Sequence, residues 1–318
     1  MAAIFSYHLS ENLKKYLDNI DLVRKRILLT PLSPQKEIRL RWNSTLERIK
    51  WSLSLSDVDV SKNEIDKILS LTNINKTSDL AKEVIGQRKA FNYLKEYWSI
   101  NSQPMSFNTI KSLYQLACEP TLGKMPKLTQ ISEAELNQLI TYLQDSHEHP
   151  VIQAAIAQIE FIRISPIEKG SGKISRLLNY LFLYKWGYDC RDLLVIDEYF
   201  RRDLVTFEKA RQTVEENKNL TIWLEYFAYG INHQLQKALE IISSPTWGTN
   251  IPKMEKLNNR QKEILLCLEN PDQKITNRDV QKMFTTSQIT ASRDLTKLVK
   301  FGLLFSHGKG RSVYYIKA

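Results

Sequence analysis

The chain has 318 residues, of which 42% are apolar, and it carries a formal net charge of +10. This length suits two ordinary domains, and the apolar content excludes a disordered chain. The basic charge favours an anionic partner such as nucleic acid.

Cysteine content and hydropathy restrict the class of protein further. The three cysteines, Cys118, Cys190 and Cys267, lie far apart and form no CxxC pair. This argues against a cysteine-based zinc site or a disulfide framework and suits a reducing cytosol. No stretch approaches the ~20 apolar residues that cross a bilayer, and the N-terminus lacks the apolar run of a signal peptide. We therefore expect a cytoplasmic protein without a membrane partner.

Residues 1 to about 243 are expected to be mostly helical. Residues 83–100 and 132–143 carry apolar side chains at three- and four-residue spacing, and prolines separate such segments. Strand-like alternation is scarce in this region. The predicted fold class is therefore mainly α, with an N-terminal helical region over residues 1–80 and a helical core over residues 81–243.

The most informative motif follows an apolar segment, residues 149–164, and runs from Ser165 to Arg176 as SPIEKGSGKISR. It resembles the core motif of the Fic (Fido) family, H-P-F-x-x-G-N-G-R-x-x-R, whose members transfer the AMP moiety of ATP to protein hydroxyls. Pro166, Gly170, Gly172 and Arg176 match the pattern. The segment over residues 220–231 is similar to the closing helix of the family. The resemblance implies a Fic-like fold for most of residues 1–243.

The same motif departs from the family at the positions that carry chemistry. Ser165 replaces the histidine that serves as general base, and an alkyl hydroxyl does not titrate near neutral pH. Ser171 replaces an asparagine that orients phosphate. Lys173 replaces an arginine, which removes a planar bidentate donor and keeps a point charge. We therefore expect no catalytic residue in this motif.

Anion binding is a separate expectation, because a glycine-flanked turn at a helix N-terminus presents backbone N–H groups and a favourable dipole. The resemblance implies ATP or another nucleotide with Mg²⁺ as ligand, and Glu168 stands at the family's metal-holding position. The alternative is a glycine-rich helix start without any ligand. The residues assigned to a nucleotide or anion are Glu168, Gly170, Ser171, Gly172, Lys173 and Arg176.

Two regulatory features of the family are also altered. The inhibitory pattern S/T-x-x-x-E-G/N finds its best match in residues 52–57, where Ser56 takes the place of the glutamate. The flap, a hairpin that docks the target peptide, would have to lie between Cys118 and Ser132, which is too short for a full flap. Loss of base, inhibitor and flap together favours a pseudoenzyme.

A second domain is expected after a linker over residues 244–257, which contains Pro245, Gly248 and Pro252. Residues 251–318 hold thirteen basic and six acidic residues, or +7 of the total charge of +10. Residues 259–269 form an amphipathic pattern. A capping-box-like start at Thr276 precedes a second helix, and Ser287 is placed to cap a third helix that contains Ile289 on its apolar side. The remaining residues alternate as a hairpin with glycines at its turn.

This order of elements over residues 258–318 resembles the winged helix-turn-helix family. A helix fits the major groove, where polar side chains meet base edges, while lysines and arginines neutralise phosphates. The alternative is that this domain packs on a protein partner. The residues predicted to contact DNA are Gln288, Thr290, Ser292, Arg293, Lys297, Lys309 and Arg311.

The leading interpretation is a cytoplasmic, bacterial, Fic-like protein that regulates transcription by binding DNA and lacks AMP-transferase activity. A homodimer would suit palindromic half-sites. Two alternatives remain open: a divergent nucleotidyltransferase that adenylylates proteins, and an antitoxin-like module that binds another protein through its helical body.

Overall fold

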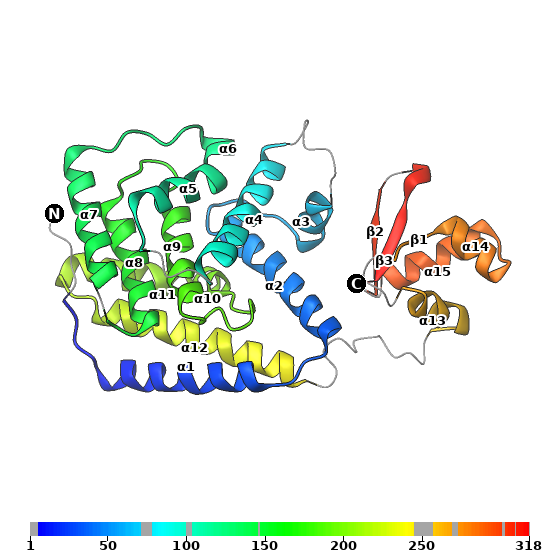
Figure 1. Cartoon of the computed structure of the whole chain (residues 1–318), viewed down its shortest axis with the longest axis horizontal. Coiled ribbons are helices and arrows are strands. Elements are labelled where there is room, and N and C mark those ends of the chain that lie inside the picture. Colours follow the sequence, from blue (N-terminus) through cyan, green and yellow to red (C-terminus); the bar gives the residue numbers. More distant parts are fainter. Residues whose placement is uncertain are drawn as a thin grey trace. The chain divides into compact units, whose positions relative to one another are not determined.

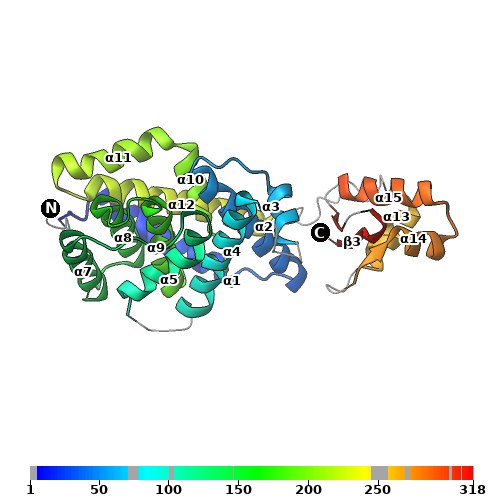
Figure 2. The ribbon, with the colours of Figure 1, turned by 90° about the horizontal axis from the view of Figure 1, so that it is seen from above.

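The computed structural model describes residues 6–70, 78–99, 104–145, 147–244, 257–268, 273–300, 303–308 and 310–317. The chain divides into two compact units, residues 1–243 and 244–318, which are described separately below. Figures 1 and 2 show the helices of each unit. Most of the linker predicted over residues 244–257 lies outside the described residues.

The first unit is built from helices, and none of its described residues lies in a strand. Its helices are α1 (Glu11–Leu29), α2 (Pro34–Ser54), α3 (Lys62–Leu69), α4 (Asp79–Trp98), α5 (Phe107–Ala117), α6 (Glu119–Leu122), α7 (Gln130–Asp145), α8 (Pro150–Ile164), α9 (Ser171–Lys185), α10 (Ile196–Arg202), α11 (Leu204–Asn217) and α12 (Thr221–Ser243).

Serine caps explain where the first four helices begin. Ser10, Ser33, Ser61 and Ser78 each precede a helix in extended conformation and accept a backbone N–H bond from its first turn. Such caps satisfy N–H groups that have no partner inside the helix. Local sequence therefore fixes these helix starts before any tertiary contact forms.

Helices α8 and α9 form the centre of the first unit. In Figure 1 they lie side by side, surrounded by α4, α5, α7 and α12. Nearly every residue of each helix is buried, which identifies them as core helices rather than amphipathic surface helices. Helices α1 and α12 pack against each other along one side of this core. The turn that joins α8 to α9, residues 165–170, is thus held by the two most buried helices.

The second unit consists of α13 (Asn259–Leu266), β1 (Ile275–Thr276), α14 (Asn277–Phe284), α15 (Gln288–Lys300), β2 (Leu304–His307), a 3₁₀ turn over Gly310–Ser312 and β3 (Tyr314–Lys317). The three strands form an antiparallel sheet in the order β1-β3-β2. Ile264, Val280, Leu295 and Leu298 are completely buried in a common apolar core. Three short helices and a small sheet thus enclose a core of their own.

The expectation of a mainly α fold is confirmed. The helix predicted over residues 83–100 is α4, which begins four residues earlier, and the one predicted over residues 132–143 is α7. The two-residue strand β1 was not predicted. Among the described residues, no helix is both long and apolar enough to span a bilayer.

Candidate functional site

The sequence of the turn between α8 and α9 explains its backbone conformation. Ser165 ends α8 in the left-handed conformation (φ 43°), and its N–H donates to Phe161 O at 3.1 Å. Gly170 begins α9 with φ 95°, a value that favours glycine. A Cβ at this position would also lie 3.0 Å from Cys118 Sγ. Backbone conformation and close packing therefore both explain Gly170 without a ligand.

The exposed hydroxyl of Ser165 has no histidine within reach on its own helix. His149 caps the opposite end of α8, about 24 Å away along a helix of this length. Its Nδ1 accepts the Val151 N–H at 3.2 Å, and its Nε2 lies 3.2 Å from the Tyr188 hydroxyl. Burial lowers the pKa of His149. This imidazole belongs to a capping network and cannot take a proton from Ser165.

Lys173, one of the residues predicted from the sequence to bind an anion, forms an ion pair with a carboxylate of the protein itself. Its Nζ donates to Glu83 of α4 in an ion pair and lies 3.4 Å from Ala117 O. Only 6% of the lysine side chain and 13% of the glutamate side chain are exposed. Glu83 also accepts a hydrogen bond from Thr121 of α6. The charge of Lys173 thus ties α9 to α4 and α6 instead of facing the turn.

Arg176 is engaged in a similar way by the end of α2. Its Nη2 donates to Ser56 Oγ at 2.8 Å and to Ser52 O at 3.0 Å. The side chain is buried, and burial lowers the pKa of the guanidinium, while the nearby carboxylate of Asp197 opposes this shift. Ser56 is the position at which the inhibitory pattern carries glutamate. The two segments singled out in the sequence therefore meet in the structure.

The remaining residues assigned to the anion form a weaker site. Glu168 is exposed, and Ser171 Oγ donates to Ile167 O. Among the described residues, no three His, Cys, Asp or Glu side chains group to hold a metal ion. Backbone N–H groups of the first turn of α9 remain available to an anion. Lys173 is paired with Glu83, so its charge is not free for the phosphates of ATP. Arg176 is bonded only to neutral oxygens, and its Nε is buried without a partner among the described residues.

The region in which a flap was sought contains no strand. All of residues 118–132 are described, and they form α6, a turn at Gly123 and an irregular segment that leads into α7. Tyr114 and Leu122 contact the position of Gly170 from this side. This segment covers the glycine turn and presents no free hairpin edge to a peptide.

A second candidate site is the outward face of α15 in the second unit. Gln288, Ser292 and Arg293 are exposed, whereas Thr290 and Lys297 are partly buried. A shallow groove on this face is lined by Gln288, Ile289, Ser292, Arg293, Thr296 and Lys297. Four of the residues predicted from sequence to contact DNA therefore lie together along one face of one helix.

The acidic residue of α15 is turned away from this face. Asp294 is 4% exposed and accepts bonds from Arg260 Nε at 2.5 Å and from Gln261 Nε2 at 2.6 Å, both on α13. These contacts lower the pKa of Asp294 against the opposing effect of its burial. The contacts fix the rotation of α15 about its axis. They leave basic and short polar side chains on the outward surface.

One expectation for α15 was wrong. Ile289 was placed with the inward apolar residues, but it is 66% exposed and lines the groove. Position 289 lies in the first turn, where the inward direction is occupied by Ala291 and Leu295. Thr296 also lines the groove and was not singled out. Lys309 lies outside the described residues, and the Arg311 side chain is not described.

Comparisons with known proteins place the fold. No family model matches the sequence, and no curated protein matches it. A crystal structure of a Fic family protein from Desulfovibrio desulfuricans G20 matches with a TM-score of 0.63 and 12% identity, over 100% of this chain and 98% of that chain.

Two structures of Fic-1 from C. elegans also match. Their TM-scores are 0.59 and 0.58 and their identities are 17% and 18%. One alignment covers 73% of both chains and the other covers 70% of both chains. With identities this low, the likeness concerns the fold alone. The chain has the fold of Fic family proteins.

Proposed function

We propose that this protein is a DNA-binding transcriptional regulator whose Fic-like body lacks AMP-transferase activity. The observation that carries the proposal is the composition of the α15 surface. Arg293 and Lys297 line one groove with Gln288 and Ser292, while Asp294 is turned into the domain and paired. An exposed helix with this surface suits the major groove, and its cations suit the phosphates that flank it.

The arrangement of the second unit supports a winged-helix interpretation. Thr276 caps α14 through a complete capping box with Asp279, and Ser287 Oγ accepts the Thr290 N–H at 3.3 Å. Helices α14 and α15 pack against each other, and the β2–β3 hairpin follows α15. In a helix-turn-helix the second of two such helices enters the groove. We assign that role to α15.

The serine at position 165, where the Fic family pattern has its general base, supports the second part of the proposal. The hydroxyl has no imidazole within reach on α8, and Lys173 and Arg176 are held by protein groups. An enzyme that transfers a nucleotide needs a group that takes the proton from the attacking hydroxyl. The geometry therefore favours a regulator over a divergent nucleotidyltransferase.

Enrichment from a pool of genomic fragments tests the DNA-binding part. The full chain should retain a distinct subset of fragments at low salt and lose them as salt rises, because bound cations release counterions from DNA. An Arg293→Gln variant should lose the enrichment, and a Lys262→Gln variant, which removes the same charge from α13, should keep it. Enrichment that is absent from the full chain, or equal in both variants, would count against DNA binding by α15 and favour a protein partner.

Labelling with radioactive ATP and Mg²⁺ tests the missing transferase. The purified chain, incubated with a native lysate, should label no protein above a blank without the chain. Glu168→Ala serves as the diagnostic variant because this side chain is exposed and its loss should not disturb packing. Labelling that appears with the full chain and disappears with Glu168→Ala would overturn the pseudoenzyme interpretation.

A further inference from the structure

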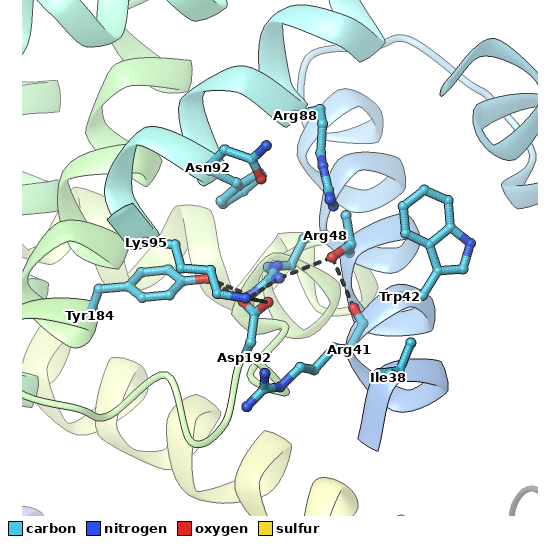
Figure 3. Close-up of a pocket in the computed structure, with 11 residues that line it drawn as sticks. Ile38, Arg41, Trp42, Arg48, Arg88, Asn92, Lys95, Tyr184 and Asp192 are labelled. Atoms are coloured by element: carbon cyan, nitrogen blue, oxygen red, sulfur yellow. Dashed lines mark hydrogen bonds and ion pairs between the residues drawn. The ribbon is translucent and has the colours of Figure 1, made fainter. Parts of the chain in front are cut away.

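A cavity of about 270 Å³ lies in the first unit, away from the glycine turn. Figure 3 shows that α2 and α4 supply facing walls and that Tyr184 and Asp192 close one side. Tyr184 lies at the far end of α9 from Gly170, about 20 Å along the helix. The cavity is therefore separate from the motif that resembles the Fic family.

Helical spacing explains why its polar residues converge. Arg88 and Lys95 lie seven residues apart on α4, so they share one face with Asn92 between them. Arg41 and Arg48 have the same spacing on α2. The two faces are turned toward each other in Figure 3. The sequence thus directs four cationic side chains into the walls of one small space.

Among the described residues, one acidic side chain lines this cavity, and it already has cationic partners. Asp192 forms ion pairs with Arg48 at 2.6 Å and with Lys95 at 3.1 Å. Burial would raise the pKa of Asp192, but Arg48, Tyr184 and Lys95 together hold it below its usual value. Arg41 pairs with Glu37 at 2.6 Å, outside the residues that line the cavity. The cavity therefore carries an excess of positive charge.

Arg88 is the one cation of this cavity that does not pair with a carboxylate of the described residues. It is half-buried, its guanidinium lies 5.3 Å from the centre of the Trp42 ring, and it makes no hydrogen bond or ion pair with any described residue. Burial lowers the pKa of this guanidinium. Arg48 Nε is also buried without a partner among the described residues. Removing a guanidinium donor from water without giving it an acceptor is costly, so Arg48 Nε favours an incoming anion, and the partly exposed guanidinium of Arg88 has no carboxylate paired with it among the described residues.

We propose that this cavity binds a small phosphate-bearing molecule, with Arg88 as its principal donor and Trp42 as one wall. A phosphate accepts hydrogen bonds in several directions, which suits donors that approach from both α2 and α4. A carboxylate is planar, and a single guanidinium fork satisfies it. The cavity volume suits a ligand smaller than a drug-sized molecule. This inference does not depend on DNA binding by the second unit.

Calorimetric titration of the full chain tests the proposal at constant ionic strength, with glycerol 3-phosphate and inorganic phosphate as probes and succinate as the carboxylate comparison. At least one phosphate probe should bind saturably at one site. In Arg88→Gln its affinity should fall about tenfold or more, the loss expected for a hydrogen bond to a charged group. In Lys89→Gln, which removes the neighbouring exposed charge of the same helix, affinity should stay within twofold.

A second variant tests the same cavity in case Arg88→Gln fails to fold. Asn92→Phe keeps every cation but fills the cavity, so phosphate binding should be lost while the melting temperature and the helical circular dichroism are retained. The proposal is overturned if neither phosphate probe binds saturably, or if Arg88→Gln and Lys89→Gln weaken binding equally. It is also overturned if Asn92→Phe folds and still binds, or if succinate binds more tightly than both phosphates.

Discussion

Arg176 of α9 donates to Ser56 Oγ at 2.8 Å, which joins the motif over residues 165–176 to the segment that best matches the inhibitory pattern of the Fic family. Ser52 O, one turn earlier on α2, accepts from the same Nη2 at 3.0 Å. The arginine that the resemblance assigns to a phosphate is therefore used to hold α2 against α9. Removing or strengthening this contact should therefore change the free energy of unfolding of the first unit.

Substitution of Ser56 tests this contact. Ser56→Ala should lower the free energy of unfolding by about 1–2 kcal/mol, because it removes a hydrogen bond to a charged and buried group. Ser56→Glu should restore that stability, since it offers a carboxylate to Arg176. Five of the six tryptophans lie in residues 1–243, so urea unfolding followed by tryptophan fluorescence reports mainly on this unit.

Ser112→Ala is a suitable control for these variants, because Ser112 is half-buried on α5 and forms no side-chain hydrogen bond with a described residue. It should change the urea midpoint little. An unchanged midpoint for Ser56→Ala would show that the contact with Arg176 contributes nothing to the stability of the unit.

The buried pair of Lys173 and Glu83 predicts a non-additive effect. Lys173→Gln leaves the Glu83 carboxylate with no cationic partner and should cost about 3 kcal/mol. Combining Lys173→Gln with Glu83→Gln removes both charges. The double variant should lose less free energy of unfolding than either single variant. A double-mutant cycle by urea unfolding measures the coupling. Additive losses would indicate that the two side chains do not interact.

Asp197 predicts a dependence of stability on pH. It is completely buried, neither carboxyl oxygen has a hydrogen-bond partner among the described residues, and burial raises its pKa to about 6 against the opposing effect of Arg176. In the unfolded chain the group titrates near its ordinary pKa of about 3.9. Between these two pKa values the folded state binds more protons than the unfolded state. The contribution of Asp197 to the free energy of unfolding therefore falls as the pH rises toward 6, and it is constant above that pH.

Comparison with Asp197→Asn isolates this contribution from those of other carboxylates. The variant should gain stability relative to the natural protein as the pH rises from 4 to 6, by up to about 3 kcal/mol, and no further above that range. Urea unfolding at pH 4, 5, 6 and 7 measures the difference. A difference that is constant over this range would show that Asp197 titrates normally in the folded protein.

Ile289 predicts a base preference. It is exposed beside Gln288 in the groove of α15, and apolar side chains in the major groove contact the methyl group of thymine. Ile289→Ala should therefore relax the preference for thymine at one position of the enriched sequence, by about 1 kcal/mol. Leu266→Ala on α13, another exposed apolar position, should leave the preference unchanged. Selection from random duplexes, followed by sequencing, compares the three proteins. Identical preferences in all three would remove Ile289 from the base-reading surface.

Local signals in the sequence predicted some elements well. The capping box at Thr276, the cap at Ser287 and the apolar spacing of the second unit indicated α13, α14 and α15, because such signals act within one or two helical turns. Strand β1 was missed because two residues carry no periodicity, and it exists only by pairing with Tyr314 and Tyr315. Ile289 was misplaced because the first residues of a helix can be apolar without being inward.

The candidate sites were harder to predict than the elements. The motif located the turn after α8, but the partners of Lys173 and Arg176 lie 90 and 120 residues away in sequence. The cavity around Arg88 combines residues from α2, α4, α9 and the segment after α9. No local pattern marks such a combination, because it arises from the way in which helices pack.

The dependence of DNA affinity on salt tests the central claim most directly. With the enriched duplex, a plot of log affinity against log salt concentration should be steep for the full chain, and Arg293→Gln or Lys297→Gln should reduce the slope by about one unit. Lys262→Gln on α13 should leave the slope unchanged. An equal slope for all four proteins, or an affinity that does not vary with salt, would contradict the assignment of α15 as the DNA-contacting helix.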